Sequence, residues 1–491
     1  MGNKIIKGFT LIELLAVIVI LAIISLIATP IIINVVENSR MKAFENSVYG
    51  VIETYKLKTI DDEDSIGVVY SFPEGNNELK YSGTKMIDGD VFLTPSKDIE
   101  VRKITDGKYC ANGNKGNLLI KKGDCTIDLA NDPILKTANN TGMTDPFLNA
   151  GIARNDIESV EFVMVSSFPA GSIDVSESGN GKVMLWTKDE NNDTRPEVYI
   201  GAINDLIYAN KNSTNLFYNM RTISKIDLKN LDTSAVTNMS NMFAVAGNSS
   251  TNFILNLGNN FDTSNVVAME GMFVSVGVFD PNFTLNLGDK FDTSAVTNMN
   301  SMFANTGNGN PNFVLNLGNK FDTSNVVDMR SMFQGLAKNN LNFTLNLGDK
   351  FNTSKVRQMR LMFDGLGKDA SNLIINLGDK FDTSKVYEMS SMFSQTGQNS
   401  VNFTLSLGDK FDTSNVESMY RMFYNAGSST SNFVLNLGDK FNLDKVSDTT
   451  DTFQNTGKLT SLFKPNATVK TQGEKNAILA KFPNINVTVI P

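Results

Sequence analysis

From Leu231 onward the chain repeats itself with a period of 30 residues, and no other feature limits its possible folds as much. Each unit opens on a phenylalanine, in the series Phe261, Phe291, Phe321, Phe351, Phe381, Phe411 and Phe441. The unit at Phe321 reads F-D-T-S-N-V-V-D-M-R-S-M-F, followed by a variable loop and N-F-T-L-N-L-G-D-K. Units of this length bury their apolar faces only against neighbouring units. We therefore predict a solenoid over residues 216–465, with caps at residues 150–215 and 466–491.

Two apolar patterns within each unit predict one helix and one strand. Apolar residues spaced by three and four predict a short helix or helical turn at Val326, Met329, Met332 and Phe333. Phe313, Leu315 and Leu317 alternate along the chain, as in a strand with one buried face. The repeats therefore predict an α/β solenoid, in which the methionine and phenylalanine columns form the core.

The same strand pattern predicts which residues face outward. If Phe313 and Leu315 point inward, Val314 and Asn316 point outward. Stacked units then present a β-branched row and an asparagine row, namely Ile254, Thr284, Val314 and Thr344 beside Asn256, Asn286, Asn316 and Asn346. The asparagine row is either a binding surface or a structural ladder that caps backbone groups. The loops that differ between units, at residues 274–280 and 334–340, are the better candidates for recognition.

The run F-D-T-S-x-V-x-x-M-x-x-M-F resembles the units of BspA-like leucine-rich-repeat surface proteins. The resemblance covers about residues 150–463. It implies a domain at the cell surface that binds an unknown protein or glycan ligand. The units of this chain are longer, with extra Asn- and Gly-rich residues after each Met-Phe pair, so the loop geometry of that family does not carry over.

An apolar segment runs from Gly8 to Val36 and contains one full charge, Glu13. About 20 apolar residues suffice to cross the hydrocarbon core of a bilayer. A carboxylate inside such a segment costs roughly 2.5–3.5 kcal/mol, so it needs a partner. Lys4 and Lys7 precede the segment and favour a cytoplasmic amino terminus, which places the rest of the chain on the outer side of the membrane.

The run K-G-F-T-L-I-E, from Lys7 to Glu13, resembles the cleavage and methylation site of type IV prepilins. The resemblance implies a leader of residues 1–8, cleavage between Gly8 and Phe9 by a prepilin peptidase, and N-methylation of Phe9. Glu13 is then the acid that pairs with the terminal amine of a neighbouring subunit. Two other interpretations remain open, an ordinary secretory signal peptide and a plain transmembrane anchor.

The helix that begins at Phe9 is predicted to continue to about Leu57. Beyond Pro30 its apolar residues follow one stripe, formed by Met41, Phe44, Val48, Ile52 and Tyr55. Residues 58–128 carry short β-like runs between Gly- and Asp-rich turns, which predict a small antiparallel sheet. Helix and sheet together predict an α+β pilin-like part. The Asn- and Thr-rich residues 129–149 are predicted to be a linker.

The chain has two cysteines, Cys110 and Cys125, and both lie in the predicted head. In an oxidising compartment a disulfide between them would close a loop of about 15 residues and contribute roughly 3 kcal/mol. Many pilins carry such a pairing near the end of the globular head, so the resemblance implies a disulfide here. Two unpaired thiols are the alternative.

Composition and charge exclude several classes of function. The net charge of −8, without any cluster of Lys or Arg, is a poor match to a nucleic-acid-binding protein. The chain contains no histidine, which excludes histidine triads and histidine metal sites. No nucleophile lies beside a base and no Gly-rich phosphate loop occurs. We therefore expect a protein that is not an enzyme and needs no cofactor or metal.

Three acidic motifs have structural explanations. The repeats carry an aspartate column, Asp262, Asp292, Asp322, Asp382 and Asp412, in which Asn352 replaces one member. We expect it to cap helix N-termini, with a calcium ladder as the alternative. The run from Asp174 to Ser178 matches the D-x-S-x-S pattern of metal-dependent adhesion sites but lacks the apolar strand before it. Residues 189–193, D-E-N-N-D, are predicted to be a solvated turn.

These features together predict a type IV pilin-like surface subunit that displays its repeats for adhesion or for protein or glycan binding. It is expected to be a minor subunit, because the repeat part is large relative to the stem. The alternatives are a pseudopilin of a type II secretion or DNA-uptake system, and a membrane-anchored surface protein outside any fibre. Expected partners are other pilin subunits, the prepilin peptidase and methylase, the membrane and a surface ligand. The chain is expected to span the inner (cytoplasmic) membrane once before assembly and to lie at the cell surface, in the pilus, afterwards.

Overall fold

The computed structural model divides into two compact units, Met1–Asp128 and Leu129–Pro491, and each is described by itself. The residues that it describes are 35–57, 69–72, 79–93, 99–116, 118–123, 132–138, 142, 145–203, 206–258, 260–288, 290–430, 433–457, 466–469, 471–482 and 486–489.

The first unit is one helix packed on a five-stranded antiparallel sheet. The helix covers residues 35–57 of the described part. The strands follow their chain order in the sheet: β1 (Val69–Phe72), β2 (Asp88–Leu93), β3 (Ile99–Thr105), β4 (Tyr109–Asn114) and β5 (Leu119–Lys122). The helix stripe is buried against the sheet at Phe44, Val48, Ile52 and Tyr55, whereas Met41 stays exposed. The predicted helix and small antiparallel sheet are therefore both present in the described residues.

The second unit begins with a six-stranded sheet in the order β13-β11-β6-β9-β8-β7. Its strands are β6 (Ser159–Val165), β7 (Ile173–Asp174), β8 (Met184–Lys188), β9 (Glu197–Ile203), β11 (Lys225–Asp227) and β13 (Ile254–Asn256). A short parallel pair, β10 (Ile207–Tyr208) with β12 (Leu231–Asp232), adjoins it. Two 3-10 turns, η2 (Phe147–Asn149) and η3 (Arg154–Asp156), precede the sheet. Phe147 and Leu148 are buried in the main core, so the end of the segment predicted to be a linker packs as part of this unit.

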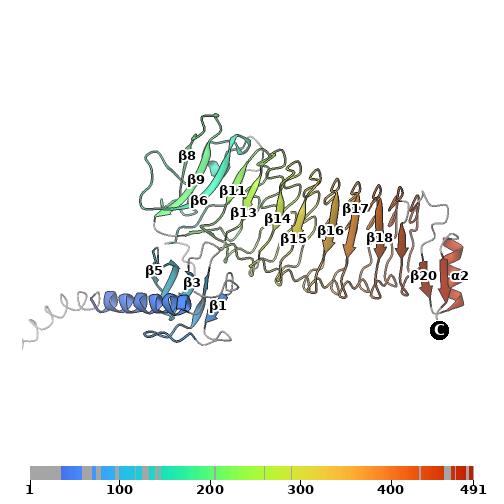
Figure 1. Cartoon of the computed structure of the whole chain (residues 1–491), viewed down its shortest axis with the longest axis horizontal. Helices are drawn as coiled ribbons and strands as arrows, with labels where there is room; N and C mark the ends of the chain where they lie inside the picture. Colours follow the sequence, from blue (N-terminus) through green and yellow to red (C-terminus); the bar gives the residue numbers. More distant parts are fainter. Residues whose placement is uncertain are drawn as a thin grey trace, which may run out of the picture. The chain divides into compact units, whose positions relative to one another are not determined.

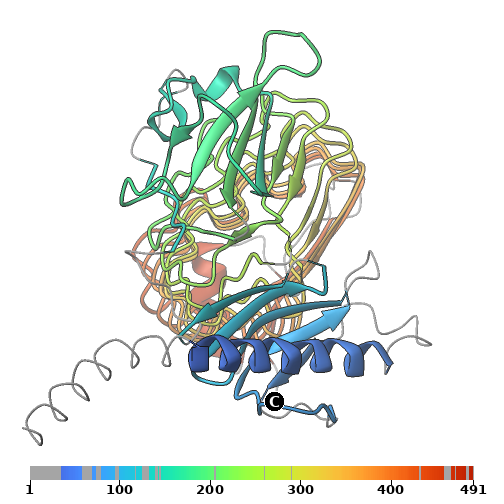
Figure 2. The ribbon, with the colours of Figure 1, turned by 90° about the vertical axis from the view of Figure 1, so that its left-hand side faces the viewer.

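The repeats form a solenoid of parallel strands (Figure 1), as predicted. These strands are β14 (Thr284–Asn286), β15 (Val314–Asn316), β16 (Asn342–Asn346), β17 (Asn372–Asn376), β18 (Asn402–Ser406) and β19 (Val434–Asn436). Paired residues are one period apart, as in Leu345 opposite Ile375. Figure 2 looks along the solenoid, where successive units lie one behind another. The chain ends with β20 (Asn466–Val469), helix α2 (Gln472–Lys481) and β21 (Asn486–Val489), and Ile478 of α2 is buried in the core of the repeats.

The helix predicted at Val326–Phe333 is replaced by a series of turns, and this part of the α/β prediction is corrected to a mostly β fold. Met332 N donates to Met329 O (3.3 Å) within the unit, but Phe333 N donates to Met362 O (2.9 Å) in the next one. Ser331 has a φ of 53°, a conformation that a right-handed helix does not contain. Alternate backbone groups therefore bond across units, where an α-helix would keep them within one segment.

The core of the solenoid is a stack of equivalent side chains. Phe273, Phe303, Phe333 and Phe363 form one column, with 5.7 Å between successive ring centroids. Met329 and Met332 are fully buried beside it. The methionine and phenylalanine columns are core, as predicted.

Within the described part of the chain, no helix combines the length and the apolar character that a membrane crossing needs. Residues 8–34, on which that prediction rests, lie outside the described residues.

Candidate binding surfaces of the repeat unit

The outward face of the parallel sheet carries a row of β-branched side chains. Ile254, Val314 and Ile374 are between 52% and 57% exposed, while the neighbouring Phe343 and Leu345 are buried. Threonines fill the alternate units at positions 284, 344 and 404, where the side chains are also exposed. The predicted inward and outward alternation is confirmed, and the face is a regular surface of aliphatic and hydroxyl groups.

Asparagines flank this row on both sides. At the carboxyl ends of the strands, Asn316 Oδ1 accepts a hydrogen bond from Gly318 N (3.0 Å). The same contact recurs at Asn256, Asn286, Asn346 and Asn436. Gly318 has a φ of 74°, so the amide caps a turn that needs glycine. The asparagine row predicted from the sequence is therefore a structural cap.

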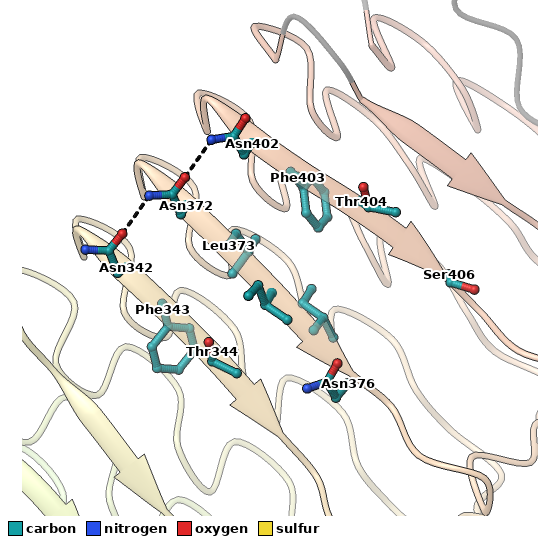
Figure 3. Close-up of a pocket in the computed structure, with 12 residues that line it drawn as sticks. Asn342, Phe343, Thr344, Asn372, Leu373, Asn376, Asn402, Phe403, Thr404 and Ser406 are labelled. Carbon is teal, nitrogen blue, oxygen red and sulfur yellow. Dashed lines mark hydrogen bonds between the residues drawn. The ribbon is translucent and has the colours of Figure 1, made fainter.

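A second asparagine ladder crosses the amino-terminal ends of β16–β18 (Figure 3). Asn372 Nδ2 donates to Asn342 Oδ1 (2.6 Å), and Asn402 Nδ2 donates to Asn372 Oδ1 (2.7 Å). An open hollow of about 580 Å³ lies over these strands, between the ladder and Asn376. None of its lining residues is ionisable. The hollow offers amide and hydroxyl groups for hydrogen bonds and has no group for acid–base chemistry.

The turns of the solenoid carry an exposed position at which the residue differs between several units. The seventh residue of successive units is Val327, Arg357, Tyr387 and Glu417, all exposed. We call these four residues the variable row. Backbone bonds stack them, since Arg357 N donates to Val327 O (3.1 Å) and Tyr387 N to Arg357 O (3.1 Å). Tyrosine and arginine dominate the energetics of many binding interfaces. The sequence signal for this surface, an exposed position that differs among these four units and holds only Thr or Val in the earlier ones, was missed at the sequence level.

The loops predicted to recognise a ligand are only partly at the surface. Phe279 in the first loop is 62% exposed. In the second, Leu336 and Ala337 are fully buried, and Asn340 Nδ2 donates to Phe313 O (2.9 Å) inside the core. Variation at residues 334–340 therefore reflects packing as much as surface chemistry.

The aspartate column caps turns. Asp322 Oδ1 accepts from Ser324 N (2.8 Å), and Asn352 makes the same contact with Ser354 N (3.0 Å) through an amide oxygen. The uncharged amide oxygen of Asn352 thus makes the same contact as the carboxylate oxygen of Asp322. In the described residues no group of three or more possible metal ligands gathers. The column is a capping device of turns, where helix capping had been predicted.

Thr323, next to this column, is fully buried and links two units. Its Oγ1 donates to Asn352 O (2.9 Å) and accepts from Asn352 N (2.8 Å). Equivalent threonines make the donor contact in the neighbouring units. One hydroxyl per unit therefore satisfies a backbone pair of the next unit.

The other acidic motifs are also occupied by their own loops. Asp174 Oδ1 accepts from the N–H and the hydroxyl of Ser176, and its Oδ2 accepts from Gly181 N (3.0 Å). In the 189–193 turn, Asp189 Oδ1 accepts from Asp193 N (3.1 Å). Both carboxylates hold loops together, and neither belongs to a cluster of possible metal ligands in the described part.

The residues predicted to serve in processing and assembly, Gly8, Phe9 and Glu13, lie outside the described residues. Cys110 is buried and disulfide-bonded. The other cysteine of the chain, Cys125, lies outside the described part.

The carboxyl group of Asp364 makes the stability of the repeats depend on pH. Burial raises the pKa of its carboxyl, against hydrogen bonds from Ser394 and Gln334 that lower it. The folded state therefore holds this proton more tightly than the unfolded chain, and stability falls as pH rises through the raised pKa.

We expect Asp364→Asn to be more stable than the wild type at neutral pH and to lose this advantage below the unfolded pKa. Urea unfolding at several pH values measures this. The exposed Asp409→Asn is the control, and an equal pH dependence in both variants would contradict the assignment.

Two family models match the chain. The family described as Mycoplasma protein of unknown function, DUF285, matches residues 211–346, 279–371 and 337–465. A model described as prokaryotic N-terminal methylation motif matches residues 3–29. No curated protein and no solved structure matches the chain. The two models cover the segments on which the prepilin and surface-repeat resemblances rest, and they confirm both.

Proposed function

The chain belongs to the family described as Mycoplasma protein of unknown function, DUF285, and from this premise we propose that it is a minor type IV pilin-like subunit that displays its repeats for adhesion. The single observation that carries the proposal is the pairing of a prepilin methylation motif with a 30-residue solenoid in one chain. The methylation motif supports insertion into a membrane and assembly into a fibre. The solenoid provides an extended surface, and its core is formed by its own units.

The surfaces of the repeats support binding over catalysis. The hollow on β16–β18 has no ionisable lining residue, so it lacks an acid, a base or a charged nucleophile. The variable row supplies arginine and tyrosine at exposed positions, which suits protein or glycan recognition. We assign adhesion to the variable row, because the sheet face is nearly the same in every unit and is explained by strand formation and turn capping.

Glu13→Ala tests the assembly role. An unpaired buried carboxylate or amine costs about 3 kcal/mol or more, so we expect incorporation into fibres to fall by about a hundredfold, with cleavage after Gly8 unchanged. Immunoblots of sheared fibres and mass spectrometry of the mature terminus measure the two steps. Glu45→Ala, in the described helix 35–57 and beyond the apolar segment, is the matched control. A mature terminus other than methylated Phe9 would refute the prepilin assignment.

Deleting residues 129–491 separates adhesion from the other possible roles. The cut falls at the boundary of the two units, because Phe147 already packs in the second one. Lost adhesion with intact fibres is the expected result. Lost secretion or DNA uptake would instead assign the protein to such a machine as a pseudopilin, and absence from fibres in the intact chain would leave a membrane-anchored surface protein.

A further inference from the structure

The outward face of the six-stranded sheet carries a fixed aromatic pair. Trp186 on β8, the only tryptophan of the chain, lies directly opposite Tyr199 on β9. Their rings are stacked, with 5.9 Å between centroids and 12° between planes, and both side chains are partly exposed. The six-membered ring of Trp186 lies over Gly201, where an added Cβ would come within 2.6 Å of it. The missing side chain at Gly201 therefore fixes the position of the indole.

A cation already lies on this pair. Lys188 Nζ is 5.0 Å from the centroid of the Tyr199 ring and donates to Glu190 Oε1 (3.0 Å). More than half of each of the Lys188 and Glu190 side chains is exposed, so this ion pair contributes little stability and is easily replaced. The arrangement shows that the ring attracts an ammonium group at this position.

The segment that carries the pair is acidic. Residues 158–203 contain eight carboxylate side chains and three basic ones, a net charge of −5 in a chain whose total is −8. Glu197 lies directly opposite Lys188. Glu161 lies beside Tyr199 on the neighbouring strand, where its Oε1 accepts from Lys225 Nζ (2.6 Å). Burial raises the pKa of the Tyr199 hydroxyl, and the charges of Glu190 and Glu161 raise it further. Glu190 and Glu197 therefore leave carboxylates beside Lys188 and the exposed rings.

We propose that the Trp186–Tyr199 pair and its carboxylates dock a lysine- or arginine-bearing segment of a partner protein. The incoming cation takes the position of Lys188 over Tyr199, and the apolar stem of that side chain packs against Trp186. Shielding of Gly201 explains why an aromatic ring lies there, but it explains neither the bound lysine nor the excess of carboxylates. The inference rests on the proposed function only in that the second unit is taken to be displayed outside the cell.

The single tryptophan makes the site directly measurable. The full chain in a non-ionic detergent is titrated with a short lysine–arginine peptide that contains no aromatic residue. We expect a saturable change in Trp186 emission, and weaker binding at higher salt. Lys188→Met removes the internal competitor and should tighten binding about two- to fivefold. Trp186→Phe should weaken binding by a similar factor, measured by the anisotropy of a labelled peptide.

Lys385→Met is the matched control, since it removes an equal charge from an exposed position in the repeats. Unchanged Trp186 emission, or equal tightening by Lys188→Met and Lys385→Met, would overturn the proposal. A neutral oligosaccharide that changes the emission where the peptide does not would also overturn it, in favour of a sugar site. None of these results depends on fibre assembly, so failure here leaves the proposed function standing, and failure of assembly leaves this titration intact.

Discussion

Phe333→Ala is expected to lower the free energy of unfolding by about 4 kcal/mol, since fully buried phenylalanines cost about 3–5 kcal/mol on truncation. The ring is fully buried and stacks between Phe303 and Phe363, each with 5.7 Å between centroids. The residues that would border the cavity belong to three successive units that bond to one another through their backbones. We expect little collapse of the cavity for this reason.

The same substitution should also divide the unfolding transition. Solenoid units are stabilised by nearest neighbours, so a weak central interface uncouples the two ends. Urea unfolding followed by circular dichroism reports on the whole repeat array. Trp186 fluorescence reports on the six-stranded sheet at the start of the second unit. The two midpoints should coincide in the wild type and separate in Phe333→Ala. Val327→Ala, at a position 43% exposed in the same unit, is the control and should change stability by less than about 0.5 kcal/mol.

Arg154→Met is expected to destabilise the second unit by about 3 kcal/mol. Arg154 is fully buried, and its Nη1 donates to Leu216 O (3.0 Å) and Tyr218 O (3.1 Å). Burial lowers its pKa to about 10, which leaves the group charged at neutral pH and makes both bonds charge-assisted. Each buried carbonyl that loses such a donor costs about 1–3 kcal/mol.

The methionine keeps much of the apolar volume against Phe147, whose ring centroid lies 5.5 Å from the guanidinium. The measured loss therefore reports mainly on the two hydrogen bonds. Thermal melting followed by Trp186 fluorescence is the measurement. Arg360→Met, at an exposed position, is the control and should leave the midpoint unchanged. A midpoint for Arg154→Met equal to that of the control would show that these carbonyls do not need the guanidinium.

The solenoid and its core were predictable because both follow from the period. Phe313, Leu315 and Leu317 alternate along the chain, and the buried strand face is where that alternation puts it. The helix at Val326–Phe333 could not be distinguished from turns in this way. Spacings of three and four also fit consecutive turns, and the deciding factors are the φ of Ser331 and the hydrogen bonds to the next unit. The hydrogen bonds to the next unit are not local to the unit that contains the pattern.

The binding surfaces were less predictable from the sequence. The sequence allows two roles for Asn316, a binding residue or a backbone cap. The hydrogen bond from Gly318 N to its Oδ1 shows that Asn316 caps the turn. The Trp186–Tyr199 pair depends on the register between β8 and β9, which brings together residues on either side of the acidic turn. That register is set by tertiary pairing, and no periodic pattern in residues 184–203 encodes it. The buried columns were therefore predictable from the sequence, whereas the variable row and the residues that act through one cross-strand contact were not.

The buried threonines bear on how the repeat array can gain or lose units. Thr293, Thr323, Thr353 and Thr383 each bond the N–H and the C=O of the same backbone residue in the next unit, so the interfaces between these units carry the same pair of contacts. An in-frame duplication or deletion of 30 residues among these units would therefore keep the threonine contacts at the new interface. Each duplication lengthens the array by one strand spacing, about 4.8 Å. Recombination between its own repeats would thus change the length of the solenoid without any new fold or new residue.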